Sequence, residues 1–282
     1  MLRRSMLRTL PLAVIVSSVG LAWAPPAHAT VTSSVDGGVL SVEGDETSDS
    51  VRIKCRDDEV RVNGDDPGTG SFACADLTGI VVSVLGGNDR VDLNRIDGDR
   101  FPLLTSNLVQ GGDGDDVIVG SALDDDLRGE AGNDDLSPEG GAANVVDGGS
   151  GVDEIVEHRA AAVVATDAAF AAAGTSAISR IEGLRLSGTS KADSLDTRRF
   201  DGRVVLTGLG GADSLLGGPG PTDLSGGDGS DTLSGGTGDD FLLGGRGPDE
   251  LLGKAGRDRL DGGEGTDSCK GGPGADQTRN CE

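Results

Sequence analysis

Residues 208–279 read GLGGADSLL, GGPGPTDLS, GGDGSDTLS, GGTGDDFLL, GGRGPDELL, GKAGRDRLD, GGEGTDSCK and GGPGADQTR, eight nine-residue units without an insertion. Glycine favours positions 1, 2 and 4, aspartate holds position 6, and an apolar residue usually holds position 8. This unbroken period predicts units that stack on their neighbours. We expect positions 7 to 9 to form a short strand with position 8 inward. Two units should make one coil, so each unit stacks on the unit eighteen residues away.

The spacing within a unit suits a hard cation. Glycine permits a left-handed backbone and leaves carbonyl oxygens uncovered, and the aspartate at position 6 adds an anionic oxygen. Ca²⁺ takes about six to eight oxygen ligands from carboxylates, carbonyls and water. One turn cannot supply that many, whereas two stacked turns can.

The repeated unit resembles the RTX, or haemolysin-type, calcium-binding nonapeptide G-G-x-G-x-D-x-U-x. The resemblance is close over 208–279, clear over 111–156 and looser elsewhere. It implies an all-β fold, a parallel β-roll or β-solenoid built from GGxGxDxUx repeats with an irregular β N-terminal part. It also implies several Ca²⁺ ions between stacked turns and folding that depends on calcium. The aspartates that it assigns to calcium are Asp116, Asp125, Asp134, Asp153, Asp213, Asp231, Asp240, Asp249, Asp258, Asp267 and Asp276. The glycines that it assigns to the same turns are Gly111, Gly112, Gly114, Gly226, Gly227, Gly229, Gly235, Gly236, Gly238, Gly244, Gly245 and Gly247.

The aspartates of 208–279 should form two columns on opposite sides of the roll. One column would contain Asp213, Asp231, Asp249 and Asp267, and the other would contain Asp240, Asp258 and Asp276. The second column lacks its first member, because Thr222 holds position 6 there and Asp223 is shifted by one. In the earlier block Asp116 and Asp134 should stack, with Asp125 on the other side.

The first residues have the pattern of an export signal. Arg3, Arg4 and Arg8 form a positive region, 10–23 is mostly apolar, and 27–29 is a small-x-small cleavage site. The apolar run is too short for a comfortable membrane span. We therefore expect cleavage near Ala29 and a secreted or extracellular protein without a transmembrane segment.

Charge and composition restrict the partners. Residues 1–29 contain three of the 24 basic residues and no acid, so the remaining chain has a formal charge of −27, against −24 for the whole sequence. Such a surface attracts cations and repels nucleic acid and anionic membranes. The remaining chain has no Trp and no Tyr, which predicts a thin aliphatic core. We expect calcium ions and no nucleic acid as partners, and a protein or polysaccharide surface partner stays possible.

Four cysteines allow three pairings, and export permits disulfides. Cys55 and Cys74 flank a polar loop, and Cys269 and Cys281 flank the last repeat. We predict local pairing, Cys55 with Cys74 and Cys269 with Cys281. A zinc site is the alternative, but the chain has no C-x-x-C and only one histidine beyond residue 29.

The rest of the chain divides by its similarity to the repeat. Residues 30–110 are expected to form a degenerate β-solenoid, or a separate small β region, with acid and apolar positions at Asp49 with Val51 and at Asp89 with Val91. Residues 111–156 form a first calcium-binding block, 157–207 irregular connecting β coils, and 208–282 the main roll with a disulfide cap. Helix propensity favours a helix in the alanine-rich run 160–173, but its β-branched residues and its place between repeats favour strand.

Catalytic signatures are scarce. His158 is the single histidine beyond residue 29, so an H-E-x-x-H site cannot form there, and no G-x-S-x-G elbow occurs. We expect a calcium-binding structural or surface-interaction protein and no enzyme. The alternative is a calcium-dependent β-solenoid enzyme that acts on an acidic polysaccharide.

Overall fold

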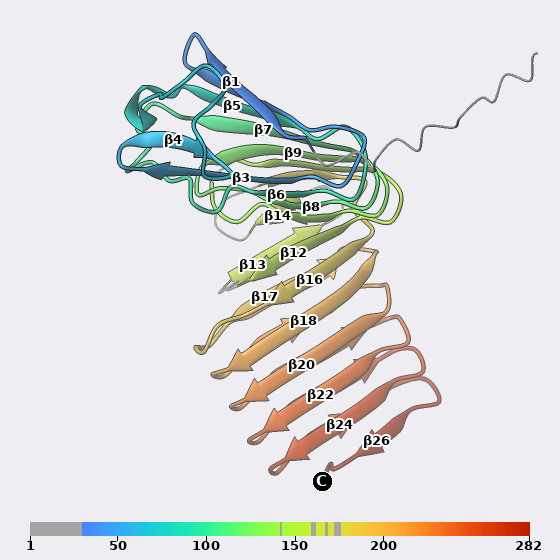
Figure 1. Ribbon diagram of the computed structural model, residues 1–282. Helices are drawn as coiled ribbons and strands as arrows, with labels where there is room; N and C mark the ends of the chain where they lie inside the picture. Colours follow the sequence, from blue (N-terminus) through green and yellow to red (C-terminus); the bar gives the residue numbers. More distant parts are fainter. Residues whose placement is uncertain (1–29, 142, 159–161, 167–168, 172–175) are drawn as a thin grey trace, which may run out of the picture.

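Two long β-sheets enclose one narrow core (Figure 1). The structure is a computed structural model that describes residues 30–141, 143–158, 162–166, 169–171 and 176–282. The expected signal peptide, 1–29, lies outside these residues. Within them the only helix is a single 3-10 turn, η1 (Cys74–Asp76), so no described helix could cross a bilayer. The all-β prediction is confirmed.

The chain alternates between the two sheets through most of its length. The first sheet has 14 described strands, in the order β1 (Thr32–Asp36), β2 (Val39–Glu43), β5 (Gly79–Ser83), β7 (Ser106–Asp113), β9 (Asp124–Ala131), β11 (Val145–Ser150), β15 (Ser176–Ser179), β14 (Ala169–Ala171), β13 (Ala162–Thr166), β17 (Ser194–Arg199), β19 (Ser214–Leu216), β21 (Thr232–Gly236), β23 (Glu250–Lys254) and β25 (Ser268–Lys270). The second has 12, in the order β4 (Glu59–Val62), β3 (Ser50–Arg56), β6 (Arg90–Asp92), β8 (Val117–Val119), β10 (Asp135–Ser137), β12 (Glu154–His158), β16 (Gly183–Ser187), β18 (Arg203–Gly210), β20 (Thr222–Asp228), β22 (Phe241–Arg246), β24 (Arg259–Glu264) and β26 (Gln277–Arg279).

The eighteen-residue coil predicted for the repeats is confirmed by the strand register. In the second sheet Asp223 pairs with Phe241 and Phe241 with Arg259, and in the first sheet Thr232 pairs with Glu250, all in parallel. Position 8 points inward, because the leucines there are at most 2 % exposed. These leucines are Leu215, Leu224, Leu233, Leu242, Leu251 and Leu260.

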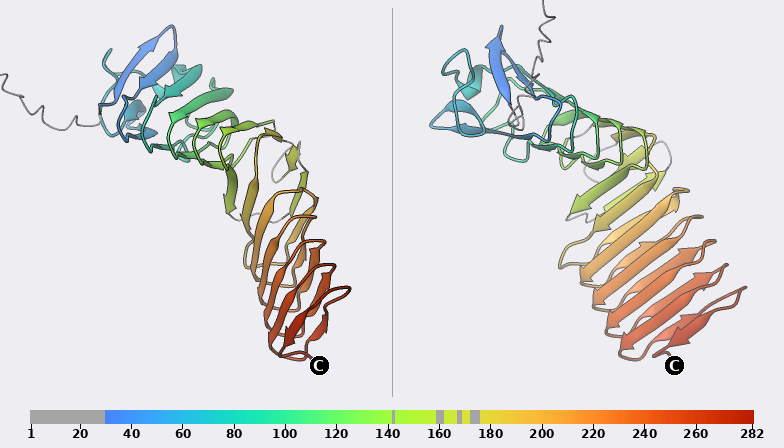
Figure 2. Two further views of the ribbon diagram at one scale, coloured as in Figure 1. Left: turned by 90° about the vertical axis from the view of Figure 1, so that its right-hand side faces the viewer. Right: turned by 45° about the vertical axis from the view of Figure 1, so that its right-hand side comes forward.

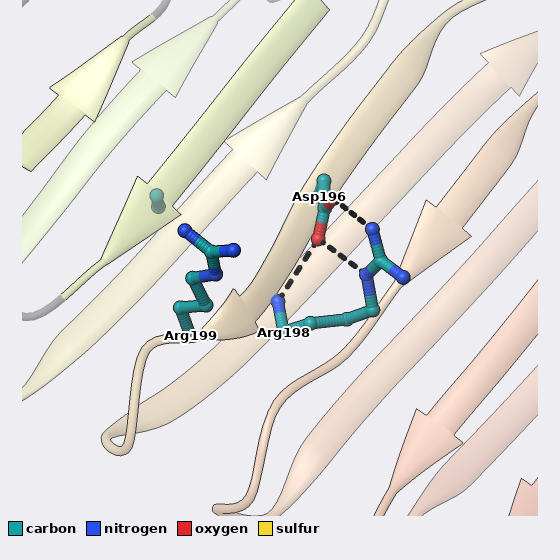
Figure 3. Close-up of a pocket in the computed structure, with 4 residues that line it drawn as sticks. Asp196, Arg198 and Arg199 are labelled. Atoms are coloured by element: carbon teal, nitrogen blue, oxygen red, sulfur yellow. Dashed lines mark hydrogen bonds and ion pairs between the residues drawn. The ribbon is translucent and has the colours of Figure 1, made fainter.

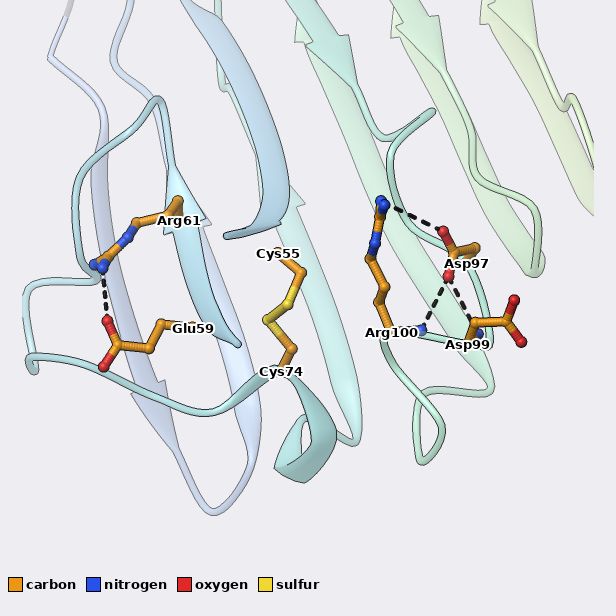
Figure 4. The surroundings of a disulfide bond; sticks show 7 residues. All are labelled: Cys55, Glu59, Arg61, Cys74, Asp97, Asp99 and Arg100. Carbon is orange, nitrogen blue, oxygen red and sulfur yellow. Dashed lines mark hydrogen bonds and ion pairs between the residues drawn. A yellow bond between two sulfur atoms is a disulfide. The ribbon is translucent and has the colours of Figure 1, made fainter. Parts of the chain in front are cut away.

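The N-terminal coils have a denser core and two antiparallel additions. Strand β1 pairs antiparallel with β2, and β4 pairs antiparallel with β3, so a hairpin covers the start of each sheet. Strand β2 then pairs in parallel with β5, and β5 with β7, so the first sheet continues into the repeats. The predicted Cys55–Cys74 disulfide is present and ties β3 to η1 (Figure 4). This part of the fold therefore has covalent and apolar support of its own.

An insertion separates the two repeat blocks in the first sheet. Between β11 and β17 this sheet contains β15, β14 and β13, whereas β12 pairs directly with β16 in the second sheet. Strand β14 is antiparallel to both of its neighbours. Where the alanine-rich run is described it is strand, as predicted; residues 159–161, 167–168 and 172–175 lie outside the described part. The extra strands lengthen one sheet only, and the coils before and after them run in different directions (Figure 2).

The second predicted disulfide closes the C-terminal coil. Cys269 holds position 8 in β25 and is bonded to Cys281, with 5.7 Å between the Cα atoms. Described residues therefore contain no free cysteine, and the zinc alternative has no thiol ligands left.

Loss of this bridge is expected to loosen the last coil and to leave earlier coils unchanged. In the chain-entropy model a closed loop of about this length contributes about 3 kcal/mol. Replacing both cysteines, Cys269→Ser with Cys281→Ser, should therefore speed amide hydrogen exchange in β25 and β26. Exchange mass spectrometry in calcium would measure this, and unchanged protection of both strands would contradict it.

Candidate metal-binding turns

The first six residues of each unit lead the chain from one sheet to the other and are called its turn, although the preceding strand often extends into positions 1 to 3, as β22 does up to Arg246. Turns that lead into the first sheet form one row, and turns that lead into the second sheet form another. Position 6 lies at the start of a strand or directly before it, so strand stacking brings the position-6 side chains of successive coils together. The first row contains Asn107, Asp125, Asn144, Asp193, Asp213, Asp231, Asp249 and Asp267. The second row contains Asp49, Asp89, Asp116, Asp134, Asp153, Glu182, Thr222, Asp240, Asp258 and Asp276.

A hydrogen-bond ladder connects the position-6 residues of each row. In the first row Asp213 N–H donates to Oδ1 of Asp231, 2.8 Å, and Asp231 N–H donates to Oδ1 of Asp249, 2.9 Å. In the second row Asp240 N–H donates to Oδ1 of Asp258, 3.0 Å. Asp258 N–H donates to Oδ1 of Asp276, also at 3.0 Å. Both columns expected in 208–279 therefore form.

The earlier block has the same ladder along its second row. Asp116 N–H donates to Oδ1 of Asp134, 2.8 Å, and Asp134 N–H donates to Oδ1 of Asp153, 2.9 Å. Asp153 N–H then donates to Oε2 of Glu182, 2.9 Å. The sequence reading missed Glu182, although an acid two residues before the buried Leu184 repeats the spacing of Asp153 and Ile155.

The second carboxylate oxygen of most ladder residues has no protein partner. Ten aspartates are at most 3 % exposed, and in each the Oδ2 atom is buried without a hydrogen bond. They are Asp89, Asp116, Asp134, Asp153, Asp213, Asp231, Asp240, Asp249, Asp258 and Asp267. A buried anionic oxygen without a partner is costly. Turns with this feature are called open turns below, and a cation in the gap between coils would satisfy them.

Glycine at position 1 keeps space for these oxygens. A Cβ added at Gly244 would overlap both Oδ2 of Asp249 and the carbonyl oxygen of Gly262 in the next coil. The same overlap recurs in the other open repeat turns, at Gly111, Gly226 and Gly235. Each gap therefore places a carboxylate oxygen beside a carbonyl oxygen, the donor types that Ca²⁺ prefers.

Positions 2 and 4 use the left-handed backbone. Their φ angles are +118° and +117° at Gly245 and Gly247. Of the predicted turn glycines, Gly112, Gly114, Gly227, Gly229, Gly236, Gly245 and Gly247 have positive φ. Gly238 is not among them, but a side chain there would overlap the carbonyl of Gly220 in the previous coil. Glycine is therefore favoured at positions 2 and 4 for two reasons: the left-handed backbone and the close stacking of successive turns.

In three turns, called closed turns below, Oδ2 of the aspartate accepts a hydrogen bond from the same turn, although Oδ1 of Asp49 has no partner among the described residues. In each, the N–H of the position-2 residue donates to Oδ2 of the aspartate at position 6. The pairs are Asp45 with Asp49, 2.7 Å, Ser121 with Asp125, 2.7 Å, and Thr189 with Asp193, 2.5 Å. The side-chain oxygen at position 2 also accepts the N–H of position 4, and the pairs are Thr47 with Asp45, Leu123 with Ser121, and Lys191 with Thr189.

Asp125, which the sequence resemblance assigns to calcium, lies in one of these closed turns. Its Oδ1 accepts further hydrogen bonds from Ser121 Oγ, 2.9 Å, and Asn107 Nδ2, 2.7 Å. Both carboxylate oxygens of Asp125 thus accept hydrogen bonds from protein donors. Asp125 lies in the predicted place, opposite Asp116 and Asp134, but it lacks the unpartnered oxygen that they have.

The second row lacks a carboxylate at Thr222, as the sequence indicated. Thr222 occupies position 6, is 1 % exposed, and donates its N–H to Oδ1 of Asp240, 2.9 Å. Asp223 points outward and forms an ion pair with Arg203, 2.8 Å. Asp223 therefore does not replace the missing carboxylate.

Burial raises the pKa of the ladder aspartates. The pKa of Asp116 and of Asp240 rises to about 7, and that of Asp134 and of Asp249 to about 6. Desolvation is the largest cause in each; the hydrogen bond from the preceding ladder N–H opposes it, and nearby aspartates add to it. A metal ion that bound these carboxylates near neutral pH would therefore displace a proton.

Acid is therefore expected to stabilise the metal-free fold. A folded-state pKa above the usual aspartate pKa of about 3.9 means that the folded chain binds more protons than the unfolded chain at intermediate pH. This stabilisation is complete below about pH 4 and is lost as the pH rises through about 6 to 7. In excess chelator, far-ultraviolet circular dichroism should show more β-structure at pH 4.5 than at pH 8. Less β-structure at pH 4.5 would contradict the prediction.

Other charged groups on the surface do not form a comparable site. A shallow pocket is lined by Ala165, Asp196, Arg198 and Arg199 (Figure 3). Arg198 donates twice to Asp196, at 2.9 and 2.6 Å, so its charge is already paired. Among the described residues no three His, Cys, Asp or Glu side chains converge to hold a metal. A metal in the turns must therefore use backbone carbonyls together with one or two carboxylates.

A family model for the RTX calcium-binding nonapeptide repeat matches four times, at residues 110–143, 201–224, 222–251 and 243–277. The chain carries RTX-type calcium-binding repeats, and the resemblance read from the sequence is confirmed. No curated protein matches the chain.

Proposed function

We propose that this is an exported calcium-binding protein whose repeats fold when Ca²⁺ enters the gaps between stacked turns. The observation that carries the proposal is the set of ten buried aspartates with an unpartnered Oδ2 in the open turns. Their chemistry fits calcium, because a hard ion accepts carboxylate and carbonyl oxygens together. Bound calcium would supply positive charge to both coils at each gap.

The residues would act in three ways. The aspartates at position 6 provide the anionic oxygens, and their Oδ1 atoms hold the previous coil through its N–H. The glycines at position 1 leave room for the oxygens, and the glycines at positions 2 and 4 let the turns stack. The ligands that we propose are the aspartates of the open turns that the sequence resemblance assigns to calcium, together with Asp276 in the last unit. Asp125 is excluded.

Export is part of the proposal, based on the leader pattern in residues 1–29 and on the two disulfides. Outside the cell calcium is plentiful, and extracellular modules bind it with Kd of about 10⁻⁴ to 10⁻³ M. The role we infer is structural or surface-interacting. The alternative, an enzyme acting on acidic polysaccharide, has no comparable observation in its favour, and an assay on polyuronates with and without calcium would test it.

A calcium titration tests the proposed function directly. The metal-free chain 30–282 at neutral pH should gain β-structure cooperatively as Ca²⁺ is added, followed by far-ultraviolet circular dichroism. Mg²⁺ is the control, because it demands octahedral geometry and keeps its waters. Full β-structure in excess chelator, or equal ordering by Mg²⁺, would refute calcium-dependent folding.

A further inference from the structure

Position 2 separates the open turns from the closed turns. All ten open turns have a left-handed residue at position 2, including four that are not glycine. These are Leu85, +66°, Glu130, +78°, Leu209, +78°, and Lys254, +80°. In the closed turns the described backbone at Asp45, Ser121 and Thr189 is not left-handed, and its N–H reaches the aspartate. The conformation of position 2 therefore indicates whether Oδ2 of the aspartate is free.

The turn 84–89 is open although it lies outside the matched repeats. It reads VLGGND, so valine and leucine replace the glycines at positions 1 and 2. Its backbone nevertheless follows the repeat, with positive φ at Leu85, +66°, and at Gly87, +116°. The glycine pattern hides this turn from sequence comparison, but the chain folds it in the same way.

The turn 84–89 also stacks on the turn 111–116 as one repeat stacks on the next. Gly87 N–H donates to the carbonyl of Asp113, 2.8 Å, and between repeats Gly229 N–H donates to the carbonyl of Arg246, 2.8 Å. A Cβ at Gly112 would overlap the carbonyl of Leu85, the contact that Gly227 would make with the carbonyl of Leu209. The carbonyl oxygens of Leu85 and Asp113 are therefore placed as in the repeats, although Val84 puts a side chain at position 1, where the repeats have glycine.

Asp89 supplies the carboxylate of the turn. Its N–H donates to Oδ1 of Asp116, 2.8 Å, and its own Oδ1 accepts the N–H of Asp49, 2.6 Å. Asp89 is 3 % exposed, and its Oδ2 has no partner among the described residues. A carboxylate oxygen left unpaired at this depth needs a cation or a proton.

We propose that 84–89 is a further calcium-binding turn, with the ion in the gap between it and 111–116. Asp89, Asp116 and backbone carbonyl oxygens are the donors from this chain. The proposal rests on the calcium function proposed above and extends it beyond the repeats. Under this proposal Asp89 binds calcium and Asp125 does not, although Asp125 and not Asp89 lies in a matched repeat.

The test counts calcium ions per chain 30–282 by equilibrium dialysis and elemental analysis at saturating calcium. Asp89→Asn keeps an oxygen that can accept the N–H of Asp49 but removes the charge. This variant should bind about one ion fewer, since a hard cation site depends on its anionic ligands. Asp125→Asn is the matched control and should bind as many ions as the wild type.

A second variant separates metal loss from misfolding. Leu85→Thr copies position 2 of the closed turn at Thr189, and Leu85 is 49 % exposed, so no core contact is lost. This variant should lose the same ion while its circular dichroism spectrum in calcium is unchanged. Wild-type calcium content in both Asp89→Asn and Leu85→Thr would overturn this inference alone. A wild-type chain that binds no calcium would overturn the proposed function as well.

Discussion

Chelation of calcium is expected to unfold residues 208–282 while residues 30–110 stay folded. The repeats bury only six leucines, one in each of the first six units, and they place carboxylates in adjacent coils at about the 4.8 Å spacing of neighbouring strands. Without metal, we expect like-charge repulsion and conformational entropy to exceed what this thin core contributes. Residues 30–110 bury 17 hydrophobic side chains, among them Phe101 and Ile53, and hold the Cys55–Cys74 bridge.

Hydrogen exchange mass spectrometry of the whole chain 30–282 would measure this difference. In excess chelator at neutral pH, protection should be lost across β19 to β26 and retained in β2, β3 and β5. Added Ca²⁺ should restore the lost protection, and Mg²⁺ should not. Simultaneous loss in both regions would contradict the asymmetry, and full protection of both would contradict calcium dependence itself.

Replacement of one central ladder aspartate is expected to have the next largest effect. Asp249 accepts the N–H of Asp231 and donates its own N–H to Asp267, 3.0 Å, so it contributes to two gaps. Asp249→Ala would leave the N–H of Asp231 buried without a partner, at a cost of about 1–3 kcal/mol. It would also remove a carboxylate ligand, and we expect calcium affinity to fall about tenfold or more, which corresponds to about 1.4 kcal/mol.

Arg246→Ala is the matched control in the same unit. The Arg246 side chain is 71 % exposed, and its ion pairs with Asp228 and Glu264 are long, at 3.7 and 3.6 Å. Exposed pairs of this kind contribute about 0–1 kcal/mol. Isothermal titration calorimetry of both variants with Ca²⁺ would compare them, and Asp231→Ala should behave like Asp249→Ala. Equal calcium affinities for Asp249→Ala and Arg246→Ala would show that the aspartate at position 6 is not a calcium ligand.

The periodic part of the fold was predictable because one unit determines the next. The inward leucines, the two columns and the gap at Thr222 all follow from a nine-residue spacing that two strands per coil must share. Both disulfides were also predictable, since each pair of cysteines flanks a short local segment. In these places the sequence pattern and the packed structure depend on the same repeated geometry.

The exceptions depend on side chains that the repeat pattern leaves variable. The satisfied carboxylate of Asp125 requires Ser121 and Asn107, which are four and eighteen residues away. Only the folded structure brings both to it. Conversely, Leu85 hides an open turn, because a left-handed leucine cannot be recognised from composition. Strand was predicted for the alanine-rich run, but its place as extra strands in one sheet only was not, because no repeat spacing specifies the pairing of β13 to β15.

The successive coils of 208–282 also have a mechanical consequence. Each coil there is paired only with the coil before it and the coil after it, so no bond spans the length of the rod. A pulling force along the axis would load the gaps in series, and the weakest gap would set the strength of the whole. If calcium fills these gaps, the stiffness of the rod follows the surrounding calcium concentration. The Cys269–Cys281 bridge would pass tension from the chain end to β25, so that the last unit does not peel first.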